Sequence, residues 1–430
     1  MTSTALLTDQ YELTMVDAAL RSGAADRQCV FEVFARSLPG RRRYAVVAGL
    51  GRLIQAVPDF TFDAGTLDFL TGRGVISEPT RAWLADYRFT ATIGAYREGE
   101  VYFPGSPVLT VMGGFAECVV LETLALSILN HDSAVATAAI RMTSVAENRP
   151  CIEMGSRRTH EHAAIASARA AYIGGFTATS NLAAGRRWGI PTTGTAAHAF
   201  TLVHDDERAA FRAQVDALGT DTTLLVDTFD VEAGIRAAIE IAGPELAAIR
   251  LDSGDLPTQA RDARRLLDSL GATSTRIVVT SDLDEFAIAG LASAPVDGYG
   301  VGTSLVTGSG APTAGFVYKL VSRQDDDGSW VDVEKRSAGK ASAGGRKIAS
   351  RRIVGGTATA EVLRLAPAEP AADERALQHT VMRDGVIVAE PTLADARARC
   401  RESCAELPAH AMKLSPGEPA IDTIWETITS

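Results

Sequence analysis

Residues 222–230 read Thr-Thr-Leu-Leu-Val-Asp-Thr-Phe-Asp, a short apolar run that ends in acidic and small residues. The same pattern returns at 246–255, 276–282 and 296–304, and helical periodicity fills the segments between these runs. Short β-branched or aliphatic runs are typical of strands buried on both faces. Strand, polar end and helix in regular succession predict an α/β fold, either a parallel barrel or a doubly wound sheet.

The polar ends of these runs lie at 227–230, 252–255, 280–282 and 302–304. In both architectures the carboxyl ends of parallel strands share one edge, where ligand sites are usually found. Asp and Ser also cap helices, so any single end could be only an N-cap. Four consecutive polar ends favour a shared site.

Length and composition restrict the class of protein. The chain has 430 residues and a net charge of −11. The length predicts two domains, or one barrel with a substantial addition. The negative charge argues against binding to nucleic acid or to anionic lipid. The apolar region 108–129 is interrupted by Glu117 and Glu122, and it resembles a strand plus a helix more than a membrane span.

The N-terminal residues and the cysteines predict a cytoplasmic protein. No basic segment followed by an apolar core begins the sequence, so we expect no signal peptide. Five scattered cysteines, an odd number, favour a reducing compartment without disulfides. Cys400 and Cys404 are four residues apart on a predicted helix, with His410 following. A zinc site would need more ligands at closer spacing, so free thiols are favoured.

Three further features suggest binding or catalysis. Tyr11 lies off the apolar stripe of an N-terminal helix, either as a surface residue or as a ring presented to a flat ligand. Arg157 and Arg158 could hold a carboxylate or phosphate, or could be a solvated pair. His198 follows the small residues 194–197, which makes it a candidate acid, base or nucleophile.

Taken together, the sequence resembles the nicotinate phosphoribosyltransferase family, whose members join nicotinate to phosphoribosyl pyrophosphate and give nicotinate mononucleotide for NAD biosynthesis. Each matching segment alone would be weak, but their order and spacing are specific. The segments extend over nearly the whole chain: 8–15, 31–36, 155–158, 174–181, 194–198, 227–230, 250–255 and 300–304.

The resemblance implies an irregular α/β barrel plus a second α/β domain built from both chain ends. Residues 131–320 would form the barrel with the active site. Residues 1–130 would form the N-terminal part of the second domain. Residues 321–430 would add a β-rich part and a terminal helix. The resemblance also implies a homodimer with the active site at the subunit interface, where Tyr11 stacks on the partner's pyridine ring.

The resemblance assigns the catalytic roles. His198 would be phosphorylated by ATP, which couples ATP hydrolysis to synthesis. Asp227 or Asp230 could orient its imidazole. Asp252 and Asp255 would lie near the ribose hydroxyls and near Mg²⁺, which binds together with pyrophosphate. The transition state resembles an oxocarbenium ion, and no strong base is needed because the pyridine nitrogen already has a free lone pair.

The substrate contacts are implied in the same way. Arg157 would bind the nicotinate carboxylate, and Asp9 belongs to the same substrate-binding set as Tyr11. The other implied contacts are Arg250 with the ring and ribose; Gly300, Gly302, Thr303, Ser281 and Asp282 with the 5′-phosphate; and Arg36 and Lys319 with phosphates or pyrophosphate.

Thr177 bears on substrate choice. Nicotinamide-using relatives place an Asp in the turn that here spans 175–178, and Thr177 occupies that place. A neutral residue would not repel a carboxylate, so nicotinate is favoured over nicotinamide.

Other functions are less well supported. The same fold could act on nicotinamide or quinolinate. An aldolase barrel would need a Schiff-base lysine, and residues 170–305 contain none. A binding protein with a decayed site would not be expected to keep His198, Asp227 and Asp252. The basic segment 335–347 could be a phosphate-contacting lid or a solvated loop.

Overall fold

A computed structural model describes residues 3–335 and 343–427. The chain divides into two compact units, which we call unit 1 (Met1–Ala134 and Thr313–Ser430) and unit 2 (Val135–Pro312). The divisions therefore fall at 134/135 and 312/313, whereas the sequence predicted them at 130/131 and 320/321. Most of the predicted lid segment, residues 336–342, lies outside the described residues.

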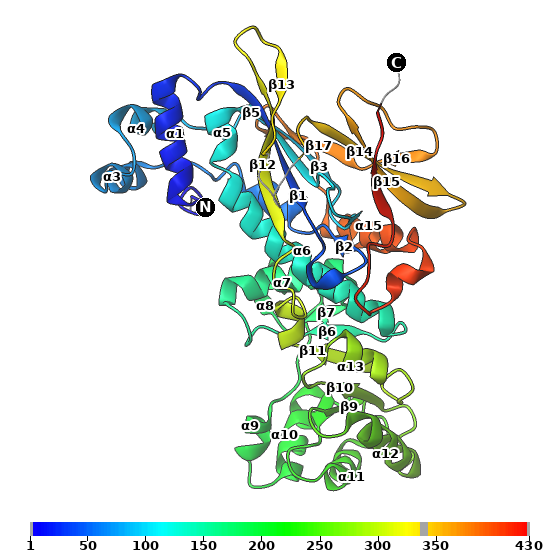
Figure 1. The fold of residues 1–430 in the computed structure, drawn as a ribbon. Helices are drawn as coiled ribbons and strands as arrows, with labels where there is room; N and C mark the ends of the chain where they lie inside the picture. Colours follow the sequence, from blue (N-terminus) through cyan, green and yellow to red (C-terminus); the bar gives the residue numbers. More distant parts are fainter. Residues whose placement is uncertain (1–2, 336–342, 428–430) are drawn as a thin grey trace. The chain divides into compact units, whose positions relative to one another are not determined.

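Unit 2 is built on a parallel sheet of six strands in the order β7-β6-β11-β10-β9-β8 (Figure 1). Every recorded pair in it is parallel, so the carboxyl ends of the strands share one edge. The four strands predicted from 222 to 301 are present, with ends shifted by two residues at most. The strands are β6 (Cys151–Glu153), β7 (Ala178–Thr179), β8 (Thr223–Leu225), β9 (Ala248–Leu251), β10 (Arg276–Val279) and β11 (Gly298–Val301).

Helices connect these strands, and several begin at an aspartate. The side chains of Asp206, Asp230, Asp255 and Asp284 accept backbone N–H groups of the first helical turn, which stabilises the helix start. The helices of unit 2 are α7 (Glu161–Ile173), α8 (Leu182–Trp188), α9 (His198–Leu202), α10 (Glu207–Leu218), α11 (Val231–Ala242), α12 (Leu256–Ser269), α13 (Glu285–Gly290) and α14 (Thr303–Val306).

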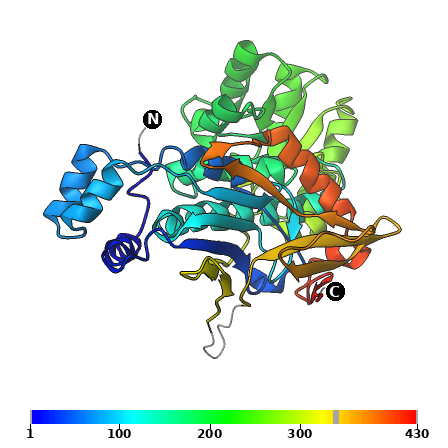
Figure 2. The ribbon, with the colours of Figure 1, turned by 90° about the horizontal axis from the view of Figure 1, so that it is seen from above.

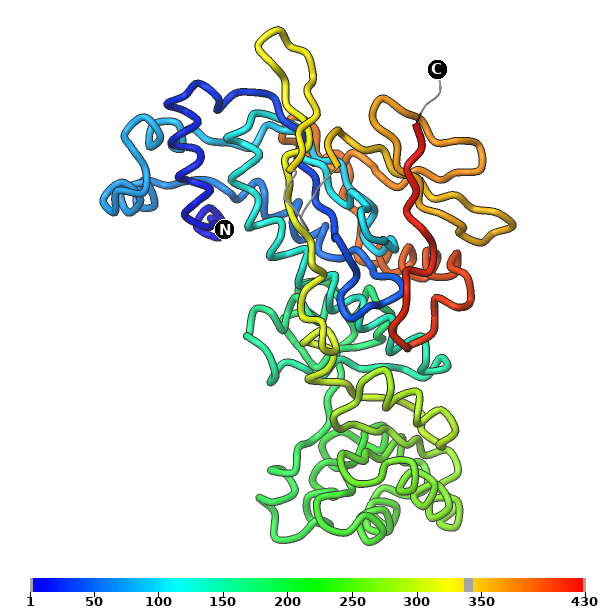
Figure 3. Tube along the Cα trace, viewed as in Figure 1, coloured from blue at the N-terminus to red at the C-terminus, as the bar shows by residue number. Residues whose placement is uncertain are grey.

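Unit 1 contains a seven-stranded sheet in the order β13-β12-β1-β5-β3-β17-β18, with antiparallel pairing. Its three central strands, β1, β5 and β3, come from the N-terminal part of the chain, and strands from the C-terminal part flank them on both sides, as the blue and the yellow-to-red segments show in Figure 3. A second domain built from both chain ends was predicted and is confirmed. The strands are β1 (Gln28–Ala35), β3 (Thr92–Tyr96), β5 (Leu109–Gly114), β12 (Phe316–Gln324), β13 (Trp330–Asp332), β17 (Gln378–Arg383) and β18 (Val386–Ile387).

Two smaller sheets and several helices complete unit 1. One sheet has the order β16-β14-β15-β19, and the other pairs β2 with β4. Figure 2 shows α1, α3 and α4, in blue, grouped at one end of the unit. The elements are β2 (Ala45–Val46), β4 (Val101–Tyr102), β14 (Lys347–Val354), β15 (Thr357–Leu365), β16 (Glu374–Ala376), β19 (Asp422–Trp425), α1 (Gln10–Ser22), α2 (Leu50–Ala56), α3 (Ala64–Gly72), α4 (Glu78–Ala85), α5 (Phe115–Val119), α15 (Leu393–Ala405) and the 3₁₀ turns Pro39–Arg41 and Ala409–Met412.

The helix α6 (Glu122–Val145) begins in unit 1 and ends in unit 2. The stretch Phe115–Val145 is long and apolar enough to cross a membrane by length and composition, but 67% of its most apolar window is buried inside the protein. Core helices of globular proteins have the same properties. The expectation of a core helix rather than a membrane span agrees with this burial.

Candidate active site

A pocket of about 260 Å³ lies in unit 2 at the edge where the strands end. It brings together nine residues singled out from the sequence: Arg157, Arg158, Arg250, Asp252, Ser281, Asp282, Gly300, Gly302 and Thr303. Met154 and Thr280 complete the lining. Sequence reasoning did not select Met154 and Thr280, although Thr280 belongs to the polar end of β10.

Three arginines give the pocket its positive charge. Arg157 and Arg158 are exposed on the loop after β6, and Arg250 is the third residue of β9. Burial lowers the pKa of Arg250, and the charges of Asp252 and Asp227 only partly oppose this. The Nε atom of Arg250 is buried and has no hydrogen-bond partner among the described residues. Three guanidinium groups around one cavity favour a bound anion.

Glu153 anchors the loop that carries Arg157. This fully buried carboxylate accepts hydrogen bonds from the N–H of Gly155 and from the hydroxyl of Thr179. A Cβ atom at Gly155 would lie 2.2 Å from Cγ1 of Val306, so only glycine fits there. These contacts therefore fix the backbone from which the side chain of Arg157 extends.

The backbone of Gly300, Gly302 and Ser281 belongs to another part of the lining. A Cβ atom at Gly300 would lie 2.4 Å from Cγ2 of Thr280 and 2.7 Å from Sδ of Met154. Ser281 has a φ of 137°, which is strained for a residue with a side chain, and such strain is concentrated at functional sites. The helix α14 after Gly302 has only four residues, so its dipole adds little.

Asp252 is the most constrained carboxylate of the pocket. Its Oδ1 accepts the hydroxyl hydrogen of Thr280, and its backbone N–H donates to Oδ2 of Asp227 at 2.8 Å. Asp227 also accepts from the hydroxyl of Ser253 at 2.9 Å. Asp227 thus holds the loop after β9, and Asp252 faces the cavity with a side chain that is 39% exposed.

His198 lies beside this loop, at the start of α9. Its Nε2 is 3.9 Å from Oδ2 of Asp252, and its Nδ1 is 3.1 Å from Oγ1 of Thr228. Sequence reasoning gave the orienting role to Asp227 or Asp230. In the structure Thr228 contacts the imidazole, while Asp227 binds the Asp252 loop and Asp230 caps α11.

Comparisons with known proteins show the family to which the chain belongs. The model of the nicotinate phosphoribosyltransferase (NAPRTase) N-terminal domain matches residues 6–130. Nicotinate phosphoribosyltransferase pncB1 of Mycobacterium tuberculosis is 58% identical, over 97% of this chain and 94% of the relative. The chain belongs to the nicotinate phosphoribosyltransferase family. The Bacillus subtilis nicotinate phosphoribosyltransferase is 38% identical over 82% of this chain and 74% of its own length.

Solved structures show the same fold for this phosphoribosyltransferase. Human nicotinic acid phosphoribosyltransferase has a TM-score of 0.84 and 25% identity, with 97% of each chain covered. A protein from Pyrococcus furiosus described as nicotinate-nucleotide pyrophosphorylase has a TM-score of 0.78 and 24% identity, over 94% of this chain and 95% of its own. The predicted family and the predicted α/β fold class are both confirmed.

Two further predicted site residues of unit 2, like His198 and Asp227, do not line the pocket. Asp255 caps α12, and its Oδ2 accepts the hydroxyl hydrogen of Thr258 at 2.8 Å. Thr177 precedes β7, and its N–H donates at 2.9 Å to the carbonyl of Cys151, where β6 begins. It therefore lies at the amino edge of the parallel sheet, away from the carboxyl-end pocket. The argument that Thr177 selects nicotinate is not supported by this position.

The remaining predicted residues belong to unit 1. Tyr11, two residues after Asp9, is 45% exposed on α1, and Nζ of Lys319 on β12 is 3.8 Å from Oε1 of Glu122. Burial and the negative charges of Glu122, Glu12 and Asp9 raise the pKa of Tyr11 to about 12. Asp9, Tyr11 and Lys319 thus share one electrostatic cluster, and Glu122 is the member that the sequence did not reveal. Arg36 is exposed just after β1.

The carboxyl group of Glu207 makes the stability of this phosphoribosyltransferase depend on pH. Burial and the charges of Asp227 and Asp230 raise its pKa from 4.5 to about 7. Between these pH values the folded state therefore holds a proton that the unfolded state has released. The contribution of this proton to the free energy of unfolding is complete below pH 4.5 and is lost as the pH rises through about 7. Because glutamine does not titrate, we expect the urea midpoint of Glu207→Gln to fall less than that of the wild type as the pH rises from 4.5 to about 7.

Urea unfolding of both proteins at several pH values measures this effect. Glu232→Gln, which changes an exposed carboxylate on α11, is the matched control and should keep the wild-type pH dependence. Identical pH dependence in the wild type and Glu207→Gln would show that Glu207 titrates normally.

Proposed function

We propose that this chain transfers the phosphoribosyl group of phosphoribosyl pyrophosphate to nicotinate and releases nicotinate mononucleotide and pyrophosphate. The observation that carries the proposal is the pocket with three arginines around the constrained Asp252, in a member of this family. Both substrates are anions, and the arginines match that charge. Nicotinamide, or another pyridine, is the alternative acceptor.

Different residues of the pocket contact the nicotinate, the 5′-phosphate and the sugar. Arg157 binds the nicotinate carboxylate through its planar guanidinium group. The backbone around Gly300 and Gly302 approaches the 5′-phosphate, with Thr303, Ser281 and Asp282 at its border. The carboxylate of Asp252 stabilises the positive charge that develops on the sugar as the bond to pyrophosphate breaks.

Mg²⁺ fits this pocket as a companion of the substrate rather than as a resident ion. Within the described parts of the chain, no group of three or more His, Cys, Asp or Glu side chains could hold a metal ion. Mg²⁺ typically uses one or two carboxylates together with substrate phosphates. Asp252 is the carboxylate that would hold it, since Asp255 is engaged as a helix cap. Bound there, the ion would neutralise charge on the departing pyrophosphate.

The proposal includes ATP coupling through a phosphohistidine at His198. The imidazole side chain is 40% exposed, so Nε2 can be reached by a nucleotide. Nε2 is a nucleophile only when Nδ1 carries the ring proton, and Oγ1 of Thr228 can accept that proton in a hydrogen bond. In this tautomer Nε2 takes the terminal phosphoryl group of ATP, and ADP leaves.

Assembly and compartment are parts of the same proposal. A homodimer would use the exposed Tyr11, which follows the exposed Leu6 and Leu7 by five and four residues. Exposed apolar groups of this kind favour association with a second copy. The five cysteines are all free, which suits a reducing cytoplasm.

The test is pyrophosphate release by the purified protein with phosphoribosyl pyrophosphate and Mg²⁺. Nicotinate and nicotinamide are compared, each with and without ATP. Turnover confined to nicotinate and accelerated by ATP is the expected result. Turnover with nicotinamide alone would keep the fold and the chemistry but replace the acceptor, and no turnover with either would contradict the proposal.

Arg157→Ala should raise the KM for nicotinate much more than the KM for phosphoribosyl pyrophosphate. Loss of hydrogen bonds to a charged group costs about 1.5–3 kcal/mol, which corresponds to about a 10- to 150-fold increase in the nicotinate KM. Steady-state kinetics with each substrate varied in turn measure both constants.

Arg236→Ala is the control for this variant, because it removes an exposed arginine that pairs only with Glu232 on α11 among the described residues. It should leave both constants unchanged. A nicotinate KM that Arg157→Ala does not raise would show that another group binds the carboxylate.

A further inference from the structure

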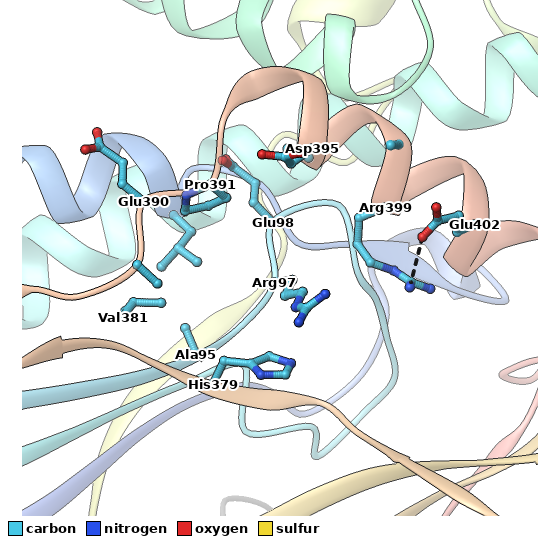
Figure 4. A pocket seen from close by; sticks show the side chains of 14 residues that line it. Ala95, Arg97, Glu98, His379, Val381, Glu390, Pro391, Asp395, Arg399 and Glu402 are labelled. Atoms are coloured by element: carbon cyan, nitrogen blue, oxygen red, sulfur yellow. Dashed lines mark hydrogen bonds and ion pairs between the residues drawn. The ribbon is translucent and has the colours of Figure 1, made fainter.

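A second cavity, of about 620 Å³, lies entirely within unit 1 and has no role in phosphoribosyl transfer as proposed. Figure 4 shows it between the strands β3 and β17 on one side and the helix α15 on the other. Ala95 and Val381 form part of an apolar floor, and Pro391 lies at the start of the opposite wall. Its volume is typical of a small-molecule site, about 300–1,000 Å³.

Two of the basic side chains that line this cavity are the exposed Arg97 and the partly buried His379. Figure 4 shows the guanidinium group of Arg97 next to the ring of His379. Neither side chain forms a hydrogen bond or an ion pair with the residues that the structure describes. Burial lowers the pKa of His379, and the nearby charges of Arg97 and Arg375 lower it further. An anion between Arg97 and His379 would relieve this repulsion.

The acidic groups of the lining make their recorded contacts with residues other than Arg97 and His379. The pairs are Glu98 with the N–H groups of Gly49 (2.6 Å) and Gly51 (3.3 Å), Glu390 with Gln55 (2.8 Å), Asp395 with Thr392 (2.7 Å), and Glu402 with Arg399 (3.2 Å). None of these four carboxylates forms a recorded hydrogen bond or ion pair with Arg97 or His379, among the residues that the structure describes.

The walls of the cavity are held in place without a ligand. Arg399 on α15 is 3.2 Å from Oε2 of the buried Glu100 and 2.9 Å from Oε1 of Glu406. Thr392 and Asp395 form a capping box that fixes the start of α15. A cavity whose walls are already ordered loses little conformational entropy when it binds a ligand.

We propose that this cavity binds a small organic carboxylate, with its carboxylate group between Arg97 and His379 and its apolar body on Ala95 and Val381. The planar guanidinium of Arg97 matches a carboxylate in geometry. A single negative charge is expected, because the lining holds four acidic side chains against two arginines and would repel a polyanion. This site is separate from the pocket of unit 2.

Isothermal titration calorimetry of the full chain with benzoate tests the proposal, and benzamide serves as the uncharged probe of the same shape. We expect benzoate to bind and benzamide to bind at least about tenfold more weakly. Arg97→Gln should weaken benzoate binding by about tenfold or more. Arg383→Gln, an exposed arginine at the end of β17, is the matched control and should bind like the wild type.

The unit 2 pocket could also attract benzoate, so Arg157→Gln is included. Benzoate binding that survives Arg157→Gln but not Arg97→Gln supports the proposal. Binding lost with Arg157→Gln and unchanged in Arg97→Gln overturns it, as does the absence of binding at millimolar benzoate. Inorganic phosphate that binds more tightly than benzoate, and is lost with Arg97→Gln, would overturn the choice of a carboxylate.

The pH dependence gives a second readout. The charges of Arg97, Arg375 on β16 and Glu100 act on His379. The cavity lining adds Glu98 after β3, Glu390 before α15, and Asp395, Arg399 and Glu402 on α15. Only protonated His379 donates from both ring nitrogens as a cation, so benzoate should bind more tightly as the pH falls through the pKa of His379. His379→Gln should remove this dependence, and an unchanged dependence in that variant would overturn the role of His379.

Discussion

Replacing His198 by alanine is expected to abolish the acceleration of phosphoribosyl transfer by ATP and to leave a slower transfer that needs no ATP. The physical reason is that His198 contributes the only proposed acceptor of the ATP phosphoryl group, whereas Asp252 and the pocket arginines remain in place. The ring contacts Thr228 and approaches Asp252 at the edge of the pocket, so its loss leaves the rest of the site intact.

The measurement is nicotinate mononucleotide formation with and without ATP, together with acid-labile phosphate on the protein after incubation with γ-labelled ATP. His204→Ala is the matched control, because His204 follows the same helix and its Nδ1 contacts the carbonyl of Phe200. This variant should keep ATP acceleration and labelling. Equal rates with and without ATP in the wild type would contradict the phosphohistidine.

The strands and the shared edge of unit 2 could be predicted from the sequence because both follow from simple periodicity. Buried parallel strands require continuous apolar runs, and their carboxyl ends must lie together. Asp252, Ser281 and Gly302 therefore converge in space although they are far apart in the chain. The family resemblance added roles to these positions.

Side-chain contacts within the site could not be predicted in the same way. Whether Asp227 or Thr228 reaches His198 depends on rotamers, and both residues stand in the same polar end. Asp255 could equally cap a helix or face a ligand, and only the structure shows that it caps α12. Thr177 belongs to a predicted turn, but the register between β6 and β7 decides at which edge of the sheet it lies.

Contacts between segments that are far apart in the chain could be predicted even less from the sequence. Lys319 lies near Glu122 because β12 packs in unit 1 beside the start of α6, and no local pattern reveals this pair. The cavity around Arg97 and His379 likewise requires β3 and β17 to pair, which brings the two ends of the chain together. Such sites depend on tertiary structure rather than on motifs.

Asp252→Asn is expected to lower kcat for nicotinate mononucleotide formation by about 10²- to 10³-fold, the usual effect of removing one electrostatic group that stabilises a transition state. The amide keeps the size of the side chain and can still accept the hydroxyl hydrogen of Thr280. Its backbone N–H still donates to Asp227. The thermal midpoint should therefore change little while the charge facing the sugar is lost.

Asp255→Asn is the comparison variant for Asp252→Asn. Asparagine caps helices about as well as aspartate, so this variant removes the second carboxylate of the same loop without weakening α12. If only Asp252 stabilises the cationic sugar, kcat falls in Asp252→Asn and stays near the wild-type value in Asp255→Asn. Similar losses in both variants would show that Asp255 turns toward the ribose when substrate binds, as the family resemblance implied. An unchanged kcat in Asp252→Asn would mean that another group stabilises the developing positive charge.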